Sequence, residues 1–315
     1  MSVTAASEPS DLLTIGGLDH AQLEHLLTVA TAMKISPLGW RERHAGQVLA
    51  CFFSKPSTRT RVSLEAAAAR LGMLPVMLRP DELQLGRGEP ISDTGRVLSS
   101  YVDAIAIRTF AQSDVEELAA AASVPVINAL TDEHHPCQAL ADLLTLNERF
   151  GRLAGLKLAY LGDGNNVAHS LLEACALMGV DIAVATPDGY RPDKRVVDGA
   201  AEVAERHGSR VELPSDPREA VAEAHSVYTD VWVSMGEEAE QAARLTALEP
   251  YRVDNKLMRC ARRDAVFMHC LPAHRGQEVA AEVINGPHSV VFEQAANRLP
   301  TEQAAIHSLI DGHWA

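Results

Sequence analysis

Residues 48–72 read VLACFFSKPSTRTRVSLEAAAARLG, an apolar run followed by a polar run and an alanine-rich run. The run 48–53 predicts a buried parallel strand, and 62–71 predicts a helix that Gly72 closes. The polar residues 54–61 therefore lie where a strand turns into a helix. Free backbone N–H groups and the positive end of the helix dipole favour an anion there, and arginine adds a planar fork that binds phosphate. The stretch predicts a phosphate site.

A second explanation of the same residues is open at this point. Ser57 or Thr58 would cap the helix, and Arg59 and Arg61 would lie on its solvated face. Taken alone, the stretch supports both explanations about equally. Three cations around one helix start, with Lys55 the third, nevertheless stand out in a chain of net charge −14.

Composition limits the class of protein. A chain of 315 residues fits two domains of ordinary size, and its many alanines and few aromatic residues suit an α/β protein. The acidic balance argues against a nucleic-acid partner or an anionic membrane. Five scattered cysteines without C-x-x-C spacing predict a reducing cytoplasm rather than disulfides. No secretory signal and no apolar run of membrane-spanning length is visible, so we expect no membrane association.

Further apolar runs in the first half also end in polar residues. The runs 74–78, 103–107 and 125–127 are predicted strands, and Arg108 directly follows the second of them. His135 lies beyond the third, at the start of a predicted helix 136–150. Ligands of open α/β sheets collect at the carboxyl ends of the strands, so these side chains are expected to converge with residues 54–61. That convergence favours the phosphate site over simple capping.

The second half repeats this organisation. The runs 156–161, 181–185, 225–229, 265–268 and 289–292 are predicted strands, and 301–310 is a predicted final helix. We therefore predict an α/β fold of two doubly wound parallel-sheet domains with the active site in the cleft between them. The first domain is expected to span 1–135 and the second 136–298, with the C-terminal helix, about 299–315, packing back onto the first.

Three motifs of the second half have competing explanations. Gly162-Asp163-Gly164 after a strand suggests a dinucleotide site, but the third glycine position falls on Val167 and no acidic residue ends the next strand, so a nicotinamide-binding function is disfavoured. The pair Asn165-Asn166 and the residues Asp230 and Ser234 could serve turns and caps alone.

His269, Cys270 and His274 lie close together in the sequence. They lack a second cluster with matching spacing, so a structural zinc site is not expected. Cys270 could also act as a covalent nucleophile, although the sequence shows no base and orienting residue dedicated to it.

With these residues assembled, nearly the whole chain resembles the aspartate/ornithine transcarbamoylase family, and most closely its ornithine-specific members. The motifs STRTR at 57–61 and HPCQ at 135–138 look like the family's carbamoyl-phosphate motifs. Asp230 with SMG at 234–236, and HCLP at 269–272, look like its ornithine motifs.

The resemblance implies transfer of the carbamoyl group of carbamoyl phosphate to the side-chain amine of L-ornithine, giving L-citrulline and phosphate, with no metal or other cofactor. Domain 1–135 would bind carbamoyl phosphate and domain 136–298 would bind ornithine. A homotrimer is implied, with sites at subunit interfaces where Gln84 reaches a neighbouring subunit's phosphate. Leu271-Pro272 is a candidate cis bond.

The resemblance also implies residue roles. The carbamoyl-phosphate residues would be Ser57, Thr58, Arg59, Thr60, Gln84, Arg108, His135, Pro136, Cys137, Gln138, Cys270, Leu271 and Arg298. The ornithine residues would be Asn166, Asp230, Ser234 and Met235, and the catalytic residues would be Arg108, His135, Gln138, Cys270 and Arg298. Arginine biosynthesis in the cytoplasm is the implied setting. The alternatives are carbamoylation of another amine, such as putrescine or N-acetylornithine, and a non-catalytic regulatory paralogue.

Overall fold

The computed structural model describes residues 11–79, 81, 88–234 and 238–312. Gln84 and Met235, both predicted to bind substrate, lie outside the described residues. The chain divides into two compact units, one made of Met1–Cys137 with Arg298–Ala315 and the other of Gln138–Asn297.

The first unit contains a parallel sheet in the order β2-β1-β3-β4. Its strands are β1 (Val48–Phe53), β2 (Leu74–Leu78), β3 (Ala104–Arg108) and β4 (Val126–Leu130), and its helices are α1 (His20–Ile35), α2 (Arg59–Leu71), α3 (Ile91–Leu98) and α4 (Gln112–Ala121). All five residues of β3 are buried, as is usual for a parallel strand with helices on both faces. The chain runs from β1 outward to β2 and then returns to β3 on the other side of β1, which makes the gap between β1 and β3 the switch point of the sheet.

Helix α2 has the boundaries that its sequence predicts at one end only. It begins at Arg59, one turn before the predicted Val62, and it buries the face that contains Leu64 and Leu71. It ends at Gly72, whose φ is +85°. A Cβ at this position would lie 2.1 Å from the carbonyl oxygen of Arg41, so the close approach of the backbone requires glycine.

The second unit contains a parallel sheet in the order β7-β6-β5-β8-β9. Its strands are β5 (Lys157–Leu161), β6 (Asp181–Ala185), β7 (Val211–Glu212), β8 (Ser226–Thr229) and β9 (Val266–Met268). Its helices are α6 (Asn166–Leu177), α7 (Lys194–His207), α8 (Pro217–Val221), α9 (Gln241–Leu248), α10 (Asn255–Met258) and α11 (Ala281–Ile284), with 3-10 turns η2 (Glu238–Glu240) and η3 (Glu249–Tyr251). The switch point lies between β5 and β8, where Leu161 pairs with Thr229.

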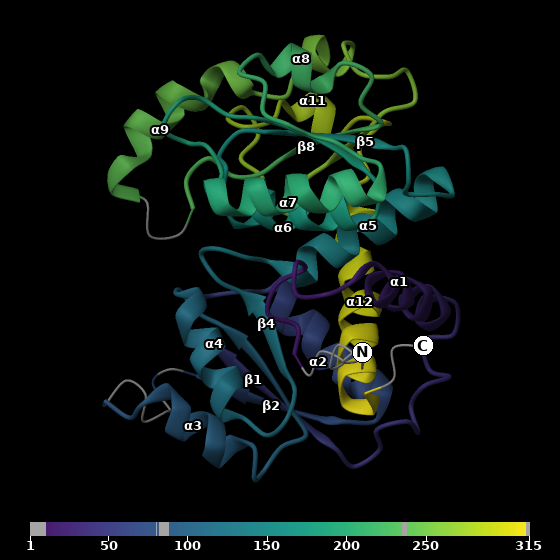
Figure 1. The fold of residues 1–315 in the computed structure, drawn as a ribbon, viewed down its shortest axis with the longest axis vertical. Helices are drawn as coiled ribbons and strands as arrows, with labels where there is room; N and C mark the ends of the chain where they lie inside the picture. The colour runs from purple at the N-terminus through teal and green to yellow at the C-terminus, as the bar shows by residue number, and fades with distance from the viewer. Residues whose placement is uncertain (1–10, 80, 82–87, 235–237, 313–315) are drawn as a thin grey trace, which may run out of the picture. The chain divides into compact units, whose positions relative to one another are not determined.

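Two helices contain the unit boundaries. Helix α5 (Pro136–Phe150) changes unit after Cys137, and α12 (Val291–Asp311) changes unit after Asn297. The C-terminal part of α12 packs in the first unit (Figure 1). There Arg298 contacts Thr60 of α2.

The predicted fold class, two α/β domains with parallel sheets, is confirmed. The predicted strand 289–292 is wrong, because α12 already begins at Val291 and Ser289 forms only an isolated bridge with Phe267. A four-residue apolar run does not distinguish a strand from the first turn of a buried helix. The short strand β7 was not predicted.

None of the described helices is long and apolar enough to cross a membrane. All five cysteines are described as free thiols.

Candidate active site

The polar turn after β1 lies at the switch point of the first sheet. Phe53 of β1 pairs in register with Arg108 of β3, and the Ser54 backbone N–H donates to the Arg108 carbonyl oxygen at 2.8 Å. The carboxyl ends of the two strands are thereby held side by side. Residues 54–58 and the Arg108 side chain therefore start from the place where ligands of such sheets bind.

The contacts at the start of α2 differ from those of a helix capped by its own side chain. Thr58 is its N-cap residue but makes no side-chain capping hydrogen bond. The next residue but one, Thr60, is buried, and its hydroxyl accepts from Arg298 Nη2 at 3.0 Å. The capping explanation therefore loses its main contact, and the helix start remains suited to an external anion.

His135 shows that three arginines converge in this unit. Its pKa is held well below the usual range, first by burial and then by the positive charges of Arg298, Arg108 and Arg59. These residues come from the loop after β4, from α12, from β3 and from α2. The imidazole is therefore neutral at pH 7 and lies among guanidinium groups, which suits it to donating a hydrogen bond to an oxygen with developing negative charge.

Two of the expected cations are engaged elsewhere. Lys55 is buried, pairs with Asp132 and lies 4.2 Å from the ring centre of Phe110. Arg61 pairs with Glu65 one turn along α2, at 3.1 Å on the exposed face. Their spacing in the sequence suggested a cluster of three cations, but local carboxylates neutralise both, and Arg59 is the cation of this stretch that acts on His135.

A hollow of about 300 Å³ adjoins the turn, lined by residues at and after the ends of β1 and β2 that include Ser57 and Arg79.

Next to His135, Pro136 is the first residue of α5. Cys137 is buried and donates from Sγ to the Asn128 carbonyl oxygen at 3.4 Å. Burial raises the pKa of Cys137 to about 12, so this thiol is a packing group rather than a reactive one.

In the second unit, Asp230 directly follows β8 at the switch point of the sheet. It is buried, and its oxygens accept from Asn165 Nδ2 at 2.8 Å, from the Val231 backbone N–H at 2.7 Å and from Cys270 Sγ at 2.8 Å. An oriented buried carboxylate at this position suits a cationic ligand.

Asn165 orients Asp230, a role that its position in the sequence does not predict. Its Oδ1 caps α6 by accepting from the N–H groups of Val167 and Ala168, and it also accepts from the Tyr160 hydroxyl at 3.1 Å. Its amide nitrogen holds Asp230. Asn166, which was predicted to bind ornithine, is the first residue of α6. The signal in the sequence was the pair of asparagines, but only the structure shows which one orients the carboxylate.

The loop after β9 brings Cys270 to Asp230. The Leu271-Pro272 bond is cis, as expected, and the Leu271 N–H donates to His269 Nδ1 at 2.9 Å. Ligand atoms of Asp230, His269 and Cys270 lie within 4.8 Å of one another. However, the other nitrogen of His269 lies 3.4 Å from Glu278, and Asp230 already accepts from the Cys270 thiol, so these donors are committed to one another.

Gln138 belongs to a buried network in the same unit. Its Nε2 donates to Asp142 Oδ1 at 2.8 Å, and Gln294 Nε2 donates to the same oxygen at 2.7 Å. Gln294 Oε1 in turn accepts from the His269 backbone N–H at 2.9 Å. Because a carboxylate only accepts, the amide of Gln138 is fixed with its nitrogen toward Asp142. The sequence does not single out Asp142 or Gln294, because their positions within helices carry no local signal.

Ser234 is half-buried and immediately precedes the undescribed residues 235–237.

The dinucleotide alternative is disfavoured by the packing around the Gly162–Gly164 turn. A Cβ at Gly164 would lie 2.3 Å from the backbone nitrogen of Pro192, so this glycine serves packing within the protein. The start of α6, where a pyrophosphate would bind, is capped by Asn165.

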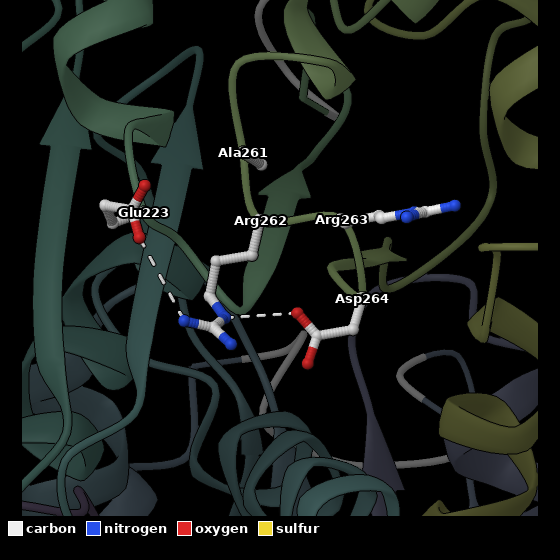
Figure 2. Close-up of a pocket in the computed structure, with 5 residues that line it drawn as sticks. All are labelled: Glu223, Ala261, Arg262, Arg263 and Asp264. Carbon is white, nitrogen blue, oxygen red and sulfur yellow. Dashed lines mark hydrogen bonds and ion pairs between the residues drawn. The ribbon is translucent and has the colours of Figure 1, made fainter.

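Figure 2 shows a pocket of about 650 Å³ in the second unit, lined by Glu223, Ala261, Arg262, Arg263 and Asp264. Arg262 lies between two carboxylates, 4.0 Å from Glu223 and 3.1 Å from Asp264 (Figure 2). The pocket adjoins the segments that lead into β8 and β9, at the ends of these strands opposite to Asp230 and Cys270. It is therefore not part of the candidate site.

Comparison with known families gives two matches. Residues 10–148 match the carbamoyl-P binding domain of aspartate/ornithine carbamoyltransferase, and residues 154–309 match the Asp/Orn binding domain.

Individual proteins are similar over almost the full length. An ornithine carbamoyltransferase from Gloeobacter violaceus is 53% identical over 305 residues, covering 96% of each chain. The solved ornithine carbamoyltransferase from Pyrococcus furiosus gives a TM-score of 0.93 at 48% identity, covering 98% of this chain and 99% of that one. The anabolic ornithine carbamoyltransferase from Campylobacter jejuni gives 0.91 at 35% identity, covering 96% and 99%.

Proposed function

The chain belongs to the aspartate/ornithine carbamoyltransferase family, and we propose that it transfers the carbamoyl group of carbamoyl phosphate to the side-chain amine of L-ornithine. The products are L-citrulline and phosphate. The observation that supports this activity most directly is the convergence of Arg59, Arg108 and Arg298 on the buried, neutral His135 at a sheet switch point.

The residues of the first unit suit carbamoyl phosphate. The start of α2, with Ser57, Thr58, Arg59 and Thr60, offers hydroxyls, backbone N–H groups and a guanidinium to the phosphate. Arg108, His135 and Arg298 would polarise the carbonyl group. Fixed donors of this kind stabilise an oxyanion without reorganising during the reaction.

Asp230 of the second unit suits the cation of ornithine. A buried carboxylate that Asn165 orients binds an ammonium group better than it binds an uncharged group. This preference favours an amino acid with two amines over an anionic acceptor. Asn166 and Ser234 are proposed to contact the amino-acid end, and Met235 to belong to the same loop. Gln138, Cys270 and Leu271 are proposed to contact the carbamoyl group; these three residues belong to the second unit.

The reaction needs no redox step. The uncharged side-chain amine attacks the carbamoyl carbon, the new C–N bond forms, and the C–O bond to phosphate breaks. The leaving phosphate can accept the proton that the amine nitrogen loses. Positioning of the two substrates and stabilisation of the oxyanion then supply the rate enhancement.

The test is citrulline formation by the purified chain, with ornithine, putrescine and N-acetylornithine compared as acceptors. We expect the highest kcat/KM with ornithine. A clear preference for either other amine, or no product with any of them, would contradict the proposal.

Arg59→Ala is expected to lower kcat by about 10²- to 10³-fold. Arg70→Ala, at a half-buried arginine near the other end of α2, is the matched control and should retain wild-type rates.

We further propose a cytoplasmic homotrimer that serves arginine biosynthesis, with Gln84 completing the phosphate site of a neighbouring subunit. Sedimentation equilibrium tests the assembly: a mass of three chains supports it and a monomer contradicts it. Mixing inactive Arg59→Ala and Gln84→Ala chains tests the shared site, because a mixed trimer would regain part of the activity.

A further inference from the structure

A cluster outside the candidate active site, in the first unit, joins the end of α12 to the loop before β1. His44 Nε2 lies 2.8 Å from His307 Nδ1. Asp311 lies one turn beyond His307 on α12, with carboxylate oxygens 3.9 Å from His44 Nε2 and 3.6 Å from His307 Nδ1. All three ligand atoms lie within 4.8 Å of one another.

These separations fit one metal ion. With bonds of about 2.0–2.1 Å, the ligands of tetrahedral zinc lie about 3.3–3.4 Å apart. The three separations in the cluster lie on both sides of this value, so small side-chain rotations would bring the ligands into place. Asp311 is partly exposed, which leaves one side for entry and for a water as the fourth ligand.

The second nitrogen of His44 has the partner that metal-binding histidines require. Its Nδ1 lies 2.6 Å from Gln47 Oε1, and Gln47 Nε2 donates to Asp103 Oδ1 at 3.5 Å. Because the Asp103 carboxylate only accepts, the amide of Gln47 presents its oxygen to His44. The proton of His44 is therefore on Nδ1, and the lone pair of Nε2 points toward His307 and Asp311.

His307 is also set for ligation. Its ring packs edge-on against Trp40, with ring centres 5.1 Å apart, and its Nδ1 lies beside Nε2 of His44. The neutral form of a histidine ring is the form that binds metals. When a metal binds, the proton between the two rings moves to Nε2 of His307, so both facing nitrogens become ligands.

We propose that His44, His307 and Asp311 bind a divalent transition metal of the zinc type, which fastens the end of α12 to the segment before β1. The two histidines are 263 residues apart and give no spacing motif, so the sequence does not predict this site. The role of such an ion is structural, since it joins two segments that otherwise meet through hydrogen bonds.

Cobalt(II) added to the purified full chain is the direct probe. We expect the visible absorption of a tetrahedral complex without a thiolate charge-transfer band, because the ligands are nitrogen and oxygen. His307→Gln should abolish this absorption, whereas Cys270→Ser should retain it. The opposite pattern would place the metal on Asp230, His269 and Cys270 and would overturn the proposal.

Gln47→Leu separates ligation from simple packing. Loss of the hydrogen bond that orients His44 should weaken cobalt affinity by about 10- to 100-fold. Asp311→Asn, at a partly exposed position, provides a ligand variant if His307→Gln does not fold. Zinc should raise the melting temperature of the wild type but not that of Asp311→Asn. An equal rise in both proteins, or unchanged cobalt affinity in Gln47→Leu, would contradict the site.

Discussion

At the scale of single residues, the candidate site depends on charged and polar groups held by buried partners. Asp230 accepts from an amide, a backbone N–H and a thiol, and His135 lies within the field of three arginines. Such groups are oriented by the fold and do not have to reorganise when charge develops. The chemistry therefore depends on a few side chains whose removal has separable effects on the two substrates.

Asp230→Asn keeps the size of the side chain and removes its charge. The loss of charge-assisted contacts to an ammonium group, at about 1.5–3 kcal/mol, is expected to raise the KM for ornithine by about 10- to 150-fold. The KM for carbamoyl phosphate should change little. Steady-state kinetics with each substrate varied in turn measures both, and Asp198→Asn on the exposed face of α7 is the control. An equal rise in both KM values would show that Asp230 does not act on ornithine.

His135 makes stability depend on pH in a defined direction. Its folded pKa lies below the unfolded value, so the unfolded chain binds more protons and the free energy of unfolding falls as the pH decreases below about 6.5. His135→Gln removes this term. Relative to the variant, the free energy of unfolding of the wild type should fall by up to about 1.4 kcal/mol for each unit by which the pH decreases, between pH 6.5 and the folded pKa.

Urea unfolding at several pH values, in phosphate-free buffer, measures the difference between the two proteins. Parallel pH profiles for wild type and variant would refute the assignment of a low pKa to His135.

At the scale of elements, Asp142 joins three parts of the second unit. It lies on α5, accepts from Gln138 on the same helix and from Gln294 on α12, and reaches the loop after β9 through Gln294. The carboxylate is fully buried, so its hydrogen bonds offset the loss of hydration. The orientation of Gln138 thus depends on a residue one turn away that contacts no predicted substrate atom.

Asp142→Ala is expected to destabilise the second unit by about 3–5 kcal/mol, because it leaves buried donors unsatisfied. It should also lower kcat by releasing Gln138. Asp142→Asn keeps one acceptor and should recover part of the activity. If Asp142→Ala lost stability but kept the wild-type kcat and KM in the folded fraction, Asp142 would be structural only and not a positioning residue.

At the scale of the whole molecule, the two units are not consecutive pieces of chain. The first is completed by Arg298–Ala315, and most described residues of this segment are buried, including Ile306 and Leu309. The second, Gln138–Asn297, is continuous. The C-terminal part of α12 therefore supplies part of the core of the first unit.

Deletion of residues 298–315 is expected to abolish cooperative unfolding of the first unit, because its core residues lose the apolar surface that α12 covers. The second unit should keep a cooperative transition, since its contacts lie within 138–297. Urea unfolding followed by Trp40 fluorescence, in a chain with Trp232→Phe, measures the first unit. The full-length chain with both Trp232→Phe and Trp314→Phe, in which Trp40 is likewise the remaining tryptophan, is the control. A wild-type-like transition after the deletion would contradict this organisation.

The sequence predicted those features that depend on neighbouring residues. Apolar runs gave most strands of both sheets, and glycine at 72 gave the end of α2. The polar residues at strand ends gave the candidate site, because parallel strands always present their carboxyl ends on one edge. The strand predicted for 289–292 is wrong because a short apolar run is compatible with both a strand and a helix.

The sequence by itself thus determined the fold class, which follows from local patterns and strand order. Most of the residues proposed to bind substrate follow from the motifs that resemble those of the family. Only the tertiary structure showed that Lys55 is neutralised, because its partner Asp132 is 77 residues away in the chain. It also decided which asparagine holds Asp230, and it brought His44 next to His307. Contacts between residues far apart in the chain depend on how the elements pack. This packing produces no recognisable spacing of residues in the sequence.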